Sequence, residues 1–439
     1  MRFRDLAATT AVLFLAGCTL FEPSDLPEKE LGEPVEVGLF EEGKVPRFEL
    51  SVKDEDWAWL NRNENALKEE YVPATLKIDG VEIGVVGVRY KGQYSLRTCF
   101  AEGKDPCPRA SLKIKFDEYR GRTRVDGMTK INLHFHFSDD SMLRERLSYR
   151  LFREMGVETA RAAHAALSVN GGPFGLYVLV EQIDEVFLAD RWNDGGEAVL
   201  WKDAWPGRGF ETLAGKWKSG PVFDAASFGE FGRAVETAAE TGDRELFERH
   251  ADPVQAMNYL AVDVVTDNFD GSRRFFCPSG TDQGNCTPHN FYWKQSWPGN
   301  RYVQIPWDLD GTFLKTPTVA LPEWNDASRP CEEFLRPGDG RKYLYTACDP
   351  WFKALRTLYP DEWKAAVKRL MKGPMSGYLV ERWLKEWKKE IEPIVDEDTL
   401  FLRHPKYDKT WWEKGYSGLT IVVGKQRQLM QDRLDGKLP

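Results

Sequence analysis

The chain has 439 residues, a formal net charge of −9 and 42% hydrophobic residues. This length and composition suffice for one large two-lobed domain or for two smaller domains. The negative charge, with no basic stripe along the sequence, argues against a nucleic-acid partner.

The N-terminus predicts a lipoprotein signal peptide over residues 1–17. Two arginines, at positions 2 and 4, precede an apolar segment that is too short to span a bilayer. The stretch Leu15-Ala16-Gly17-Cys18 resembles a bacterial lipobox, which implies acylation of Cys18 and stable anchoring of the chain to a membrane. Thr19 resembles the residue found in outer-membrane lipoproteins, so we expect the cell envelope, and the outer rather than the inner membrane. A secretory signal with a stray cysteine is the alternative.

The following residues, 18–46, predict a flexible acidic tether because they are rich in proline and glutamate and poor in aromatics. Ordered structure is expected from near Arg47. Beyond it, alternating apolar and polar residues predict five strands. These strands are expected at 48–52, 74–78, 85–91, 111–116 and 130–137.

A helix is predicted over residues 141–155, because Leu143, Leu147, Leu151 and Met155 recur every four positions. A hairpin with a glycine-rich turn follows, with strands at 166–169 and 175–180. The pattern then becomes mainly helical, with one embedded hairpin at 291–293 and 301–305. Strands that precede helices indicate an α+β fold. Further helices are predicted at 254–268, 350–371, 378–394 and 420–434.

The chain has seven cysteines, and the six besides Cys18 lie in three local pairs. In an exported protein such pairs favour disulfides, and short closure distances favour sequential pairing among the connectivities that are possible. A zinc site is the rival interpretation, but no Cys-x-x-Cys pair supports it. The predicted disulfides are Cys99–Cys107, Cys277–Cys286 and Cys331–Cys348.

Acidic and amide side chains gather between residues 268 and 312. Asp270 follows a predicted helix, Asn290 precedes the embedded hairpin, and Asp308 and Asp310 end it, on one face if the strand continues. Oxygen ligands of this kind suit Mg²⁺, and a separate aspartate could orient a hydroxyl group for phosphoryl transfer. Turn capping explains the same residues about equally well. Two strand histidines, His134 and His136, are read as packed residues rather than as metal ligands.

Several motifs, in order along the chain, resemble the CotH kinase family. They are Val-Arg-Tyr-Lys-Gly-Gln-Tyr-Ser at 88–95, Ser-Leu-Lys-Ile-Lys-Phe at 111–116, Leu-Arg-Glu-Arg-Leu at 143–147, Gly-Leu-Tyr-Val-Leu-Val-Glu-Gln-Ile-Asp at 175–184, Asn-Phe-Asp at 268–270, His-Asn-Phe-Tyr at 289–292 and Ile-Pro-Trp-Asp-Leu-Asp at 305–310. The resemblance implies an atypical, secreted protein kinase with a two-lobed kinase-like fold. The β-rich N-lobe would cover 47–225, and a helical C-lobe with the metal-binding hairpin would cover 226–439.

The resemblance also implies roles for single residues. Asp270 would be the catalytic aspartate near the acceptor hydroxyl. Glu145 is expected to be a partner for the phosphate-binding lysine only from its place on a helix between the lysine strand and the hairpin. The expected metal ligands are Asp308, Asn290 and Asp310. The expected nucleotide-binding residues are Arg89, Lys91, Gly92, Ser95, Lys113, Lys115 and Glu181, with Lys113 and Lys115 as alternatives for the phosphate contact.

The expected activity is transfer of phosphoryl from ATP, with Mg²⁺ or Mn²⁺, to serine or threonine of an envelope or extracellular protein. Two departures from the family pattern count against it. Tyr94 is bulkier than the family's residue in the phosphate-side loop, and an insertion with Cys277 and Cys286 separates Asp270 from Asn290. A non-catalytic, kinase-like structural or adhesive lipoprotein is the alternative, and nucleotide transfer on the same scaffold is a third possibility.

Overall fold

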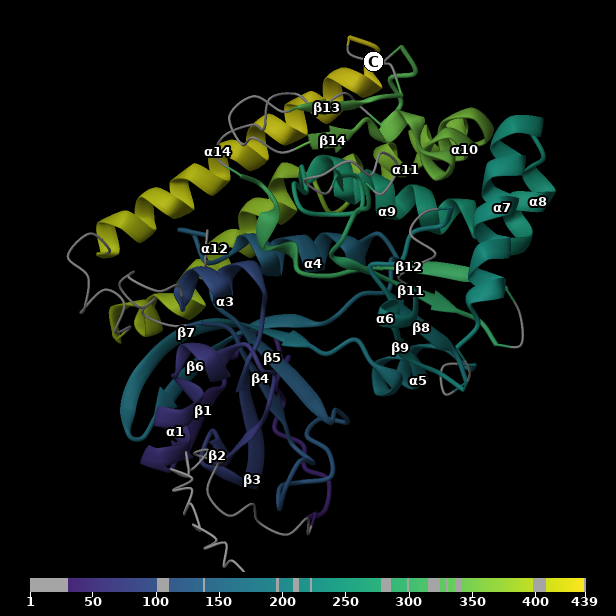
Figure 1. Cartoon of the computed structure of the whole chain (residues 1–439). Coiled ribbons are helices and arrows are strands. Elements are labelled where there is room, and N and C mark those ends of the chain that lie inside the picture. The colour runs from purple at the N-terminus through teal and green to yellow at the C-terminus, as the bar shows by residue number, and fades with distance from the viewer. Residues whose placement is uncertain are drawn as a thin grey trace, which may run out of the picture.

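The computed structural model has a β-barrel at one end and a helical lobe at the other (Figure 1). The confirmed architecture is therefore α+β, with a β-rich N-terminal lobe and a mainly helical C-terminal lobe. The structure describes residues 31–100, 110–136, 139–194, 197–207, 213–221, 223–277, 286–297, 300–314, 324–328, 331–335, 342–397 and 408–437. No helix within these ranges is both long and apolar enough to cross a membrane.

The N-terminal lobe is a closed barrel with the strand order β1-β2-β3-β4-β5-β7-β6. Parallel pairing of β1 with β6 closes it, and the other pairs are antiparallel. Alternation along β1 puts Phe48 and Leu50 inside, where they pack with Ile114, Leu133 and Tyr177. The strands are β1 (Arg47–Val52), β2 (Val72–Ile78), β3 (Val81–Tyr90), β4 (Leu112–Lys115), β5 (Lys130–His134), β6 (Ala162–Val169) and β7 (Gly172–Glu181), and the short helices α1 (Asp54–Leu60), α2 (Asn63–Ala66) and α3 (Tyr94–Cys99) lie between them.

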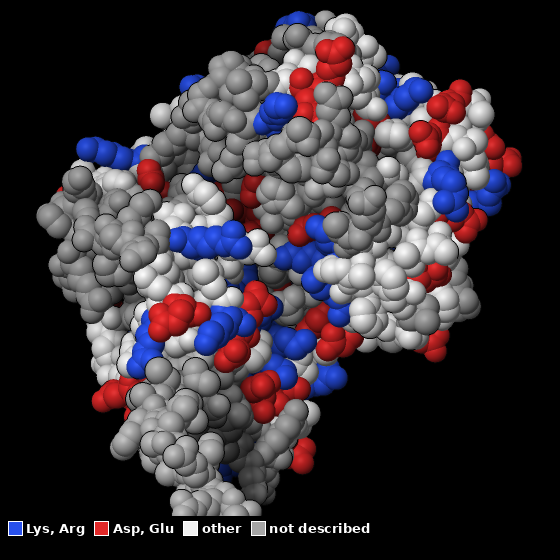
Figure 2. Space-filling model, in the orientation of Figure 1, with Lys and Arg blue, Asp and Glu red and all other residues white. Residues whose placement is uncertain are grey.

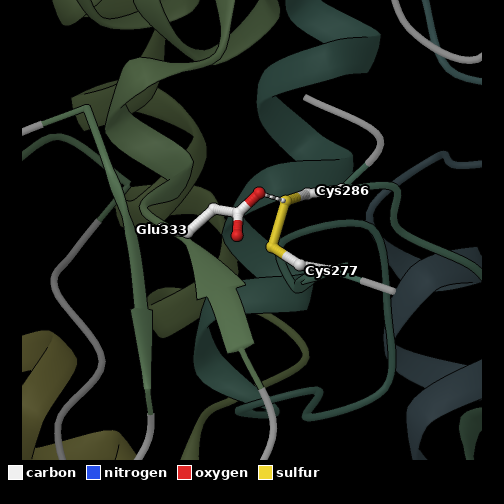
Figure 3. Close-up of side chains that lie close together, drawn as sticks. All are labelled: Cys277, Cys286 and Glu333. Atoms are coloured by element: carbon white, nitrogen blue, oxygen red, sulfur yellow. Dashed lines mark hydrogen bonds between the residues drawn. A yellow bond between two sulfur atoms is a disulfide. The ribbon is translucent and has the colours of Figure 1, made fainter. Parts of the chain in front are cut away.

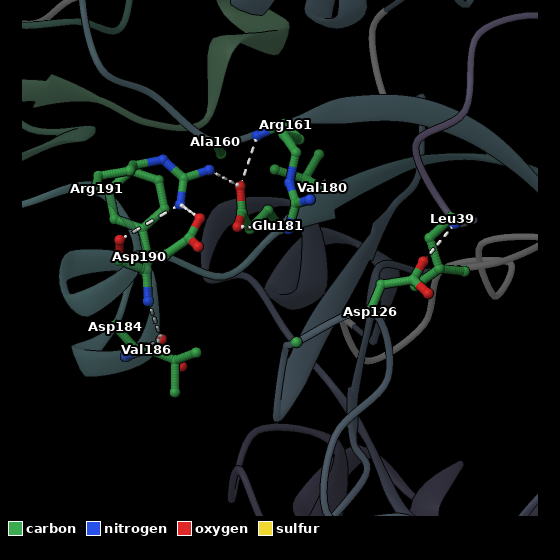
Figure 4. A network of polar contacts seen from close by, with 12 residues as sticks. Leu39, Asp126, Ala160, Arg161, Val180, Glu181, Asp184, Val186, Asp190 and Arg191 are labelled. Carbon is green, nitrogen blue, oxygen red and sulfur yellow. Dashed lines mark hydrogen bonds and ion pairs between the residues drawn. The ribbon is translucent and has the colours of Figure 1, made fainter. Parts of the chain in front are cut away.

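Residues 31–46 are not a free tether, because they pack on the barrel. Leu39 is fully buried in the barrel core, and Asp126 accepts hydrogen bonds from the backbone N–H groups of Val37, at 2.6 Å, and Leu39, at 2.5 Å (Figure 4). The ordered domain thus begins before Arg47, the position expected from composition. The proline and glutamate content of this segment predicted disorder. The buried side chain of Leu39 and the carboxylate of Asp126 nevertheless hold it on the barrel.

Replacing Asp126 with alanine is expected to release this segment. The change leaves several backbone donors without their acceptor, which costs about 1–3 kcal/mol of the free energy of unfolding. Limited proteolysis should then cut within residues 31–46 before the barrel unfolds. A matched surface change, Asp190→Ala, should leave the cleavage pattern unaltered, and equal cleavage of both variants would contradict the packing.

The C-terminal lobe is built around a second sheet with the strand order β12-β11-β8-β9. Strands β8 (Val199–Lys202) and β9 (Trp217–Ser219) belong to it and pair through β11 (Phe291–Gln295) with β12 (Tyr302–Pro306). The boundary between the lobes therefore lies soon after β7, and not at residue 225 as expected. Long-range pairing of β8 with β11 decides this, which a local sequence pattern does not reveal.

Helices cover this sheet and bury α9 (Pro253–Val265) among them. Asp252 caps α9 by accepting from the backbone N–H groups of Val254 and Gln255, and Pro253 occupies its first turn. The single helix expected at 350–371 is two helices, because Pro360 starts a new one. The remaining helices are α5 (Glu185–Arg191), α6 (Leu213–Lys216), α7 (Ala225–Thr241), α8 (Arg244–His250), α10 (Pro350–Leu358), α11 (Pro360–Lys372), α12 (Gly377–Glu397) and α14 (Lys409–Leu434).

Helix α4 (Arg144–Glu154) follows the barrel strand β5 in sequence but docks on the C-terminal lobe. Arg144 donates to the carbonyl of Thr312 at 3.2 Å, and the hydroxyl of Ser148 donates to that of Thr312 at 2.8 Å. Trp412 of α14 donates to the carbonyl of Ser141 at 3.1 Å, just before α4. Helix α4 thus holds the two lobes together.

The inserted segment after Asp270 begins with a strand of a small third sheet. In it β10 (Phe275–Cys277) pairs with β14 (Lys342–Leu344), which pairs with β13 (Glu333–Leu335). The predicted disulfides Cys277–Cys286 and Cys331–Cys348 are present. Cys99 is also disulfide-bonded, but its expected partner, Cys107, lies outside the described residues, as does Cys18.

Glu333 lies 3.7 Å from Sγ of Cys286 (Figure 3). A disulfide sulfur has no proton to donate and is not a thiolate, so this is a packing contact. The three residues do not form a metal site while the disulfide is intact.

Candidate active site between the lobes

Three polar residues meet at one edge of the C-terminal sheet. Asp203 follows β8, Asn290 precedes β11 and Asp308 follows β12, and each has a left-handed backbone with φ between 54° and 62°. The backbone N–H of Trp307 donates to the carbonyl of Asn290, and that of Asp203 to the carbonyl of Phe291, each at 3.1 Å. Left-handed non-glycine residues are uncommon and gather at functional sites, which singles out this edge.

The strand β12 ends at Pro306, so Asp308 and Asp310 do not share a strand face as expected. Residues 309–311 form a short 3₁₀ turn instead, η2 (Leu309–Gly311), and the N–H of Asp308 donates to the Tyr149 hydroxyl at 3.1 Å. The turn nevertheless keeps the two carboxyls close, since Asp308 raises the pKa of Asp310. Compact local turn geometry replaces strand alternation here.

Glu145 of α4 joins this carboxyl cluster. Its carboxylate accepts from the N–H of Leu309, and its pKa is raised well above the usual value by burial and then by Asp308. The pKa of Asp310 is likewise raised well above its usual value, by burial and then by Asp308, Glu145 and Asp270. Carboxyls this close with raised pKa values indicate a place where a cation would be stabilised.

Asp270 is held beside this cluster by its own loop. The N–H of Phe269 donates to the carbonyl of Gly311 at 3.0 Å, which joins the Asp270 loop to the Asp310 turn. Asn268 donates to the buried Asp263 at 3.0 Å, and a side chain at Gly271 would collide with Asn268. Glycine at 271 is therefore required by the tight turn that presents Asp270.

The insertion does bring Asn290 back to Asp270. Asn290 Nδ2 donates to Asp270 Oδ2 at 2.8 Å, and His289 Nε2 lies 2.7 Å from Asp270 Oδ1. Burial acts to lower the pKa of His289, but its hydrogen bond with Asp270 and the negative charges of Asp270, Asp203 and Asp308 together raise it. The centre of the Phe276 ring lies 4.6 Å from that of the His289 ring, so β10 supports the position of His289. Asp270 is oriented from both sides and remains 37% exposed.

The barrel side of the cleft is basic. Lys91 directly follows β3, and Lys113 lies on β4 opposite Arg89. Burial and then the charges of Lys91 and Arg89 lower the pKa of Lys113 well below its usual value, and Lys202 contributes to the same effect. Figure 2 shows basic and acidic side chains together on the face where the barrel meets the helical lobe. A concentration of cations opposite carboxylates suits a polyanion held with a metal ion.

Lys202, from β8 of the C-terminal lobe, is a cleft residue that the sequence analysis missed. Its charge lowers the pKa of Lys91 and of Lys113, while Asp203 and Asp308 are among the groups that raise its own pKa against the effect of burial. Lys202 therefore interacts electrostatically with both the barrel lysines and the carboxylates. The available signal was an apolar strand, 199–201, that ends in Lys-Asp, much as the strand before Asp308 ends in Trp-Asp.

Two expected nucleotide-binding residues have other partners. Lys115 forms an ion pair with Glu118. Glu181 is 2% exposed, and its carboxylate accepts from Arg161, at 2.9 Å, and Arg191, at 2.6 Å (Figure 4). The Glu181 side chain thus fixes β7 to the start of β6 and to α5, and Lys113 is the better placed of the two β4 lysines for a phosphate.

The expected phosphate-side loop connects β3 to α3. Gly92 has φ +106°, and a side chain there would meet the Ser95 hydroxyl at 3.0 Å, so the loop turns tightly over Ser95. Arg89 is turned away and pairs with Glu69 at 3.5 Å while it lies over the Tyr71 ring. Tyr94 is 69% exposed, so its bulk lies outside the protein core and does not occupy the loop interior.

Sequence comparison identifies the family. The family model described as CotH kinase protein matches residues 88–430, which covers most of the chain and the whole cleft. The chain belongs to the CotH kinase family. Inner spore coat protein H of Bacillus subtilis (strain 168) is 24% identical over 285 residues, which cover 62% of this chain and 70% of that protein.

Two solved structures are similar over part of this CotH kinase family member. The Helicobacter pylori proinflammatory kinase CtkA has 10% identity and a TM-score of 0.32, over 70% of this chain and 91% of that one. HipA of Shewanella oneidensis MR-1, in a complex with HipB and operator DNA, has 13% identity and a TM-score of 0.24, over 70% of this chain and 60% of that one. The family assignment rests on the sequence match, since these overall superpositions are limited.

The donor set of the cleft fits a divalent cation. Asp308, Asp310 and Asn290 offer oxygen atoms, which hard cations such as Mg²⁺ and Mn²⁺ prefer. Burial, and then the charge of Asp308, raise the pKa of both Asp310 and Glu145, and a divalent cation bound nearby would favour their charged forms.

This electrostatic arrangement predicts a pH-dependent stabilisation by metal. Because the folded-state pKa values of Glu145 and Asp310 are raised, the stability these groups contribute is present at low pH and is lost as pH rises through the raised values. A cation binds the deprotonated carboxylates, so Mg²⁺ or Mn²⁺ should raise the melting temperature more at about pH 8 than at about pH 5. Thermal unfolding with and without metal measures this, and Asp310→Asn should reduce the difference. An equal metal effect at both pH values would contradict the site.

Lys202 offers a test of the basic side of the cleft. Lys202→Met should weaken ATP binding about 10- to 100-fold, the equivalent of roughly 1.5–3 kcal/mol for a charged hydrogen bond. Lys115→Met is the matched control, because Lys115 is paired with Glu118 and should leave the dissociation constant unchanged. Titration calorimetry compares the two variants, and equal effects would mean that Lys202 acts only through net charge.

Proposed function

We propose that the chain is an ATP-dependent phosphotransferase that uses Mg²⁺ or Mn²⁺ and phosphorylates serine or threonine of a protein in the cell envelope or outside the cell. The observation that carries this proposal is the convergence at one cleft of three kinds of group. These are lysines from the barrel and from β8, the carboxyls of Asp308 and Asp310, and a separate aspartate, Asp270, that is oriented from both sides. Membership of a kinase family supports the same reaction class.

Each group has a distinct part in this mechanism. Lys91, Lys113 and Lys202 would hold the phosphate oxygens, and Asp308, Asp310 and the side-chain oxygen of Asn290 would hold the metal. The bound cation would neutralise phosphate charge as the reaction proceeds. Asp270 would accept the proton of the acceptor hydroxyl as that oxygen bonds to the γ-phosphorus and the bond to ADP breaks. Positioning and electrostatic stabilisation supply most of the rate in such reactions.

The hydrogen bonds at Asp270 suit this part. His289 and Asn290 each use one of its carboxylate oxygens, which fixes the rotamer while each oxygen keeps a further lone pair. Asp270 remains partly exposed, so an acceptor hydroxyl can reach it. Asp308, which would hold the metal, lies instead beside the buried Glu145 and His134. This separation of acceptor and metal positions matches the requirement for in-line transfer.

The proposal extends to location and partner. A lipid anchor at Cys18 would hold the kinase in the cell envelope, with the outer membrane favoured, and the acceptor would be a protein there. The experiment is incubation of the purified full-length chain with γ-labelled ATP, each metal in turn, and an envelope protein fraction. Label on serine or threonine supports the proposal. No ATP binding with either metal would instead favour a kinase-like structural or adhesive protein.

A further inference from the structure

His134 lies between a lysine of the barrel and the glutamate of α4. Its Nε2 is 2.5 Å from Lys91 Nζ, and its Nδ1 is 2.7 Å from Glu145 Oε1. The side chains of His134 and Glu145 are each 4% exposed, so water does not compete for these contacts. Three elements, the ends of β3 and β5 and the first turn of α4, are thereby joined through one imidazole.

The direction of both hydrogen bonds follows from the partners when Lys91 is charged and Glu145 is ionised. A charged lysine can only donate, so His134 Nε2 accepts from Lys91. The proton of the neutral imidazole is then on Nδ1, from which it is donated to the Glu145 carboxylate. The result is a continuous chain from carboxylate to ammonium, in which each bond polarises the next.

The Trp307 ring sets the position of this chain relative to the metal-binding residues. The His134 ring meets it edge-on, with 5.7 Å between ring centres, and Lys91 Nζ lies 5.3 Å from its centroid. Trp307 immediately precedes Asp308, so the lysine is held over the residue that leads into the cation site. Lys113, in contrast, has no acidic partner among the residues that the structure describes.

His134, Glu145 and Asp308 lie close enough to suggest a metal site of their own. Both ring nitrogens of His134 are already used, however, by Lys91 and Glu145. A cation on Nδ1 would have to displace the hydrogen bond to Glu145. His134 is therefore not assigned as a cation ligand, whereas Asp308 remains with Asp310 and Asn290 as a proposed ligand.

We infer that His134 is a positioning residue that connects Glu145 of α4 to Lys91, so that Lys91, rather than Lys113, is the phosphate-binding lysine whose position α4 sets. This inference rests on the proposed phosphotransferase function. It also identifies Lys91 as the lysine that is paired with Glu145, and this pairing is indirect because it runs through the imidazole of His134. Because α4 bridges the lobes, movement of α4 relative to the barrel would displace Lys91 from the phosphates.

The test compares substitutions of His134 and Glu145 in the full-length chain. His134→Phe keeps a ring against Trp307 but removes both hydrogen bonds, and His134→Gln can still accept from Lys91 and donate to Glu145. We expect His134→Phe and Glu145→Leu each to weaken ATP binding about 10- to 100-fold, the usual effect of losing a supporting hydrogen-bond partner. The double variant should bind ATP no more weakly than the single variant with the lower affinity for ATP. His134→Gln should have most of the ATP affinity of the unaltered chain. His250→Phe, at a histidine on α8 that bonds to the Asn300 carbonyl, is the matched control.

A crystal structure of His134→Phe separates this inference from the proposed function. With the fold intact, Lys91 should leave its place over Trp307. If Lys91 stays there, or if the effects of the two single changes on ATP binding multiply in the double variant, the inference is overturned while the kinase proposal stands. If the unaltered chain binds no ATP, the proposed function fails, and the position of Lys91 in the variant still decides whether His134 holds it.

Discussion

Asp308→Asn is expected to abolish metal-dependent phosphoryl transfer, with a loss of about 10²- to 10³-fold or more. Asp308 lies at the end of β12 in a left-handed conformation that asparagine also tolerates, so the backbone turn should be preserved. The amide is a neutral and weaker ligand for a hard cation. Transfer of label from γ-labelled ATP measures the loss, and calorimetry with Mg²⁺ or Mn²⁺ should show metal-dependent binding lost.

The same change should not lower stability in metal-free buffer. After burial, Asp308 makes the largest contribution of any acidic group to the raised pKa of both Glu145 and Asp310. Removing that charge relieves repulsion, so the metal-free variant should melt at the same temperature as the unaltered chain or higher. A loss of activity without a loss of stability is typical of functional residues.

Asp361→Asn is the matched control for Asp308→Asn. Asp361 is a surface aspartate, 92% exposed, with only a long ion pair to Lys364. Asp361→Asn should leave phosphoryl transfer and the melting temperature unchanged. If Asp308→Asn retains metal-dependent binding and transfer, the metal is not held at the end of β12, and the assignment of this cleft as the catalytic site fails.

Asp270→Asn should lower kcat about 10²- to 10⁴-fold while ATP binding changes little. The carboxylate is proposed to accept the proton of the acceptor hydroxyl, a role that an amide does not fill. ATP would be held by the lysines and the metal-binding residues, not by Asp270, so the dissociation constant for ATP should stay within about threefold of the original. Kinetics and calorimetry on the same preparation measure both quantities.

A second variant distinguishes orientation from proton acceptance at this position. His289 donates to Asp270 at 2.7 Å and does not itself carry the proposed role, so His289→Gln should cost about tenfold in kcat, less than Asp270→Asn. The reverse order of effects would make His289 the proton acceptor. If Asp270→Asn weakened ATP binding as much as it lowered kcat, Asp270 would instead belong among the metal-binding residues.

Much of the cleft could be predicted from the sequence because its residues lie in short, ordered motifs. Asp270, Asn290, Asp308 and Asp310 were all singled out, and the structure brings them together. Local patterns were sufficient for the barrel strands β1 to β7 and for α9, since alternation and helical periodicity depend only on neighbouring residues. The position of the lobe boundary was misjudged because strand pairing over long separations leaves no local pattern.

Tertiary structure alone decided which charged residues work together. Lys202 and Asp203 belong to the cleft because β8 pairs with β11, and His134 joins Lys91 to Glu145 because β3, β5 and α4 meet at one point. Lys113 and Lys115 look equivalent along β4, yet Glu118 pairs with Lys115. The sequence by itself determined the family, the element types and the acidic residues that are proposed as metal ligands. Burial and pairing between distant segments, which set pKa values and partners, were decided only by the folded chain.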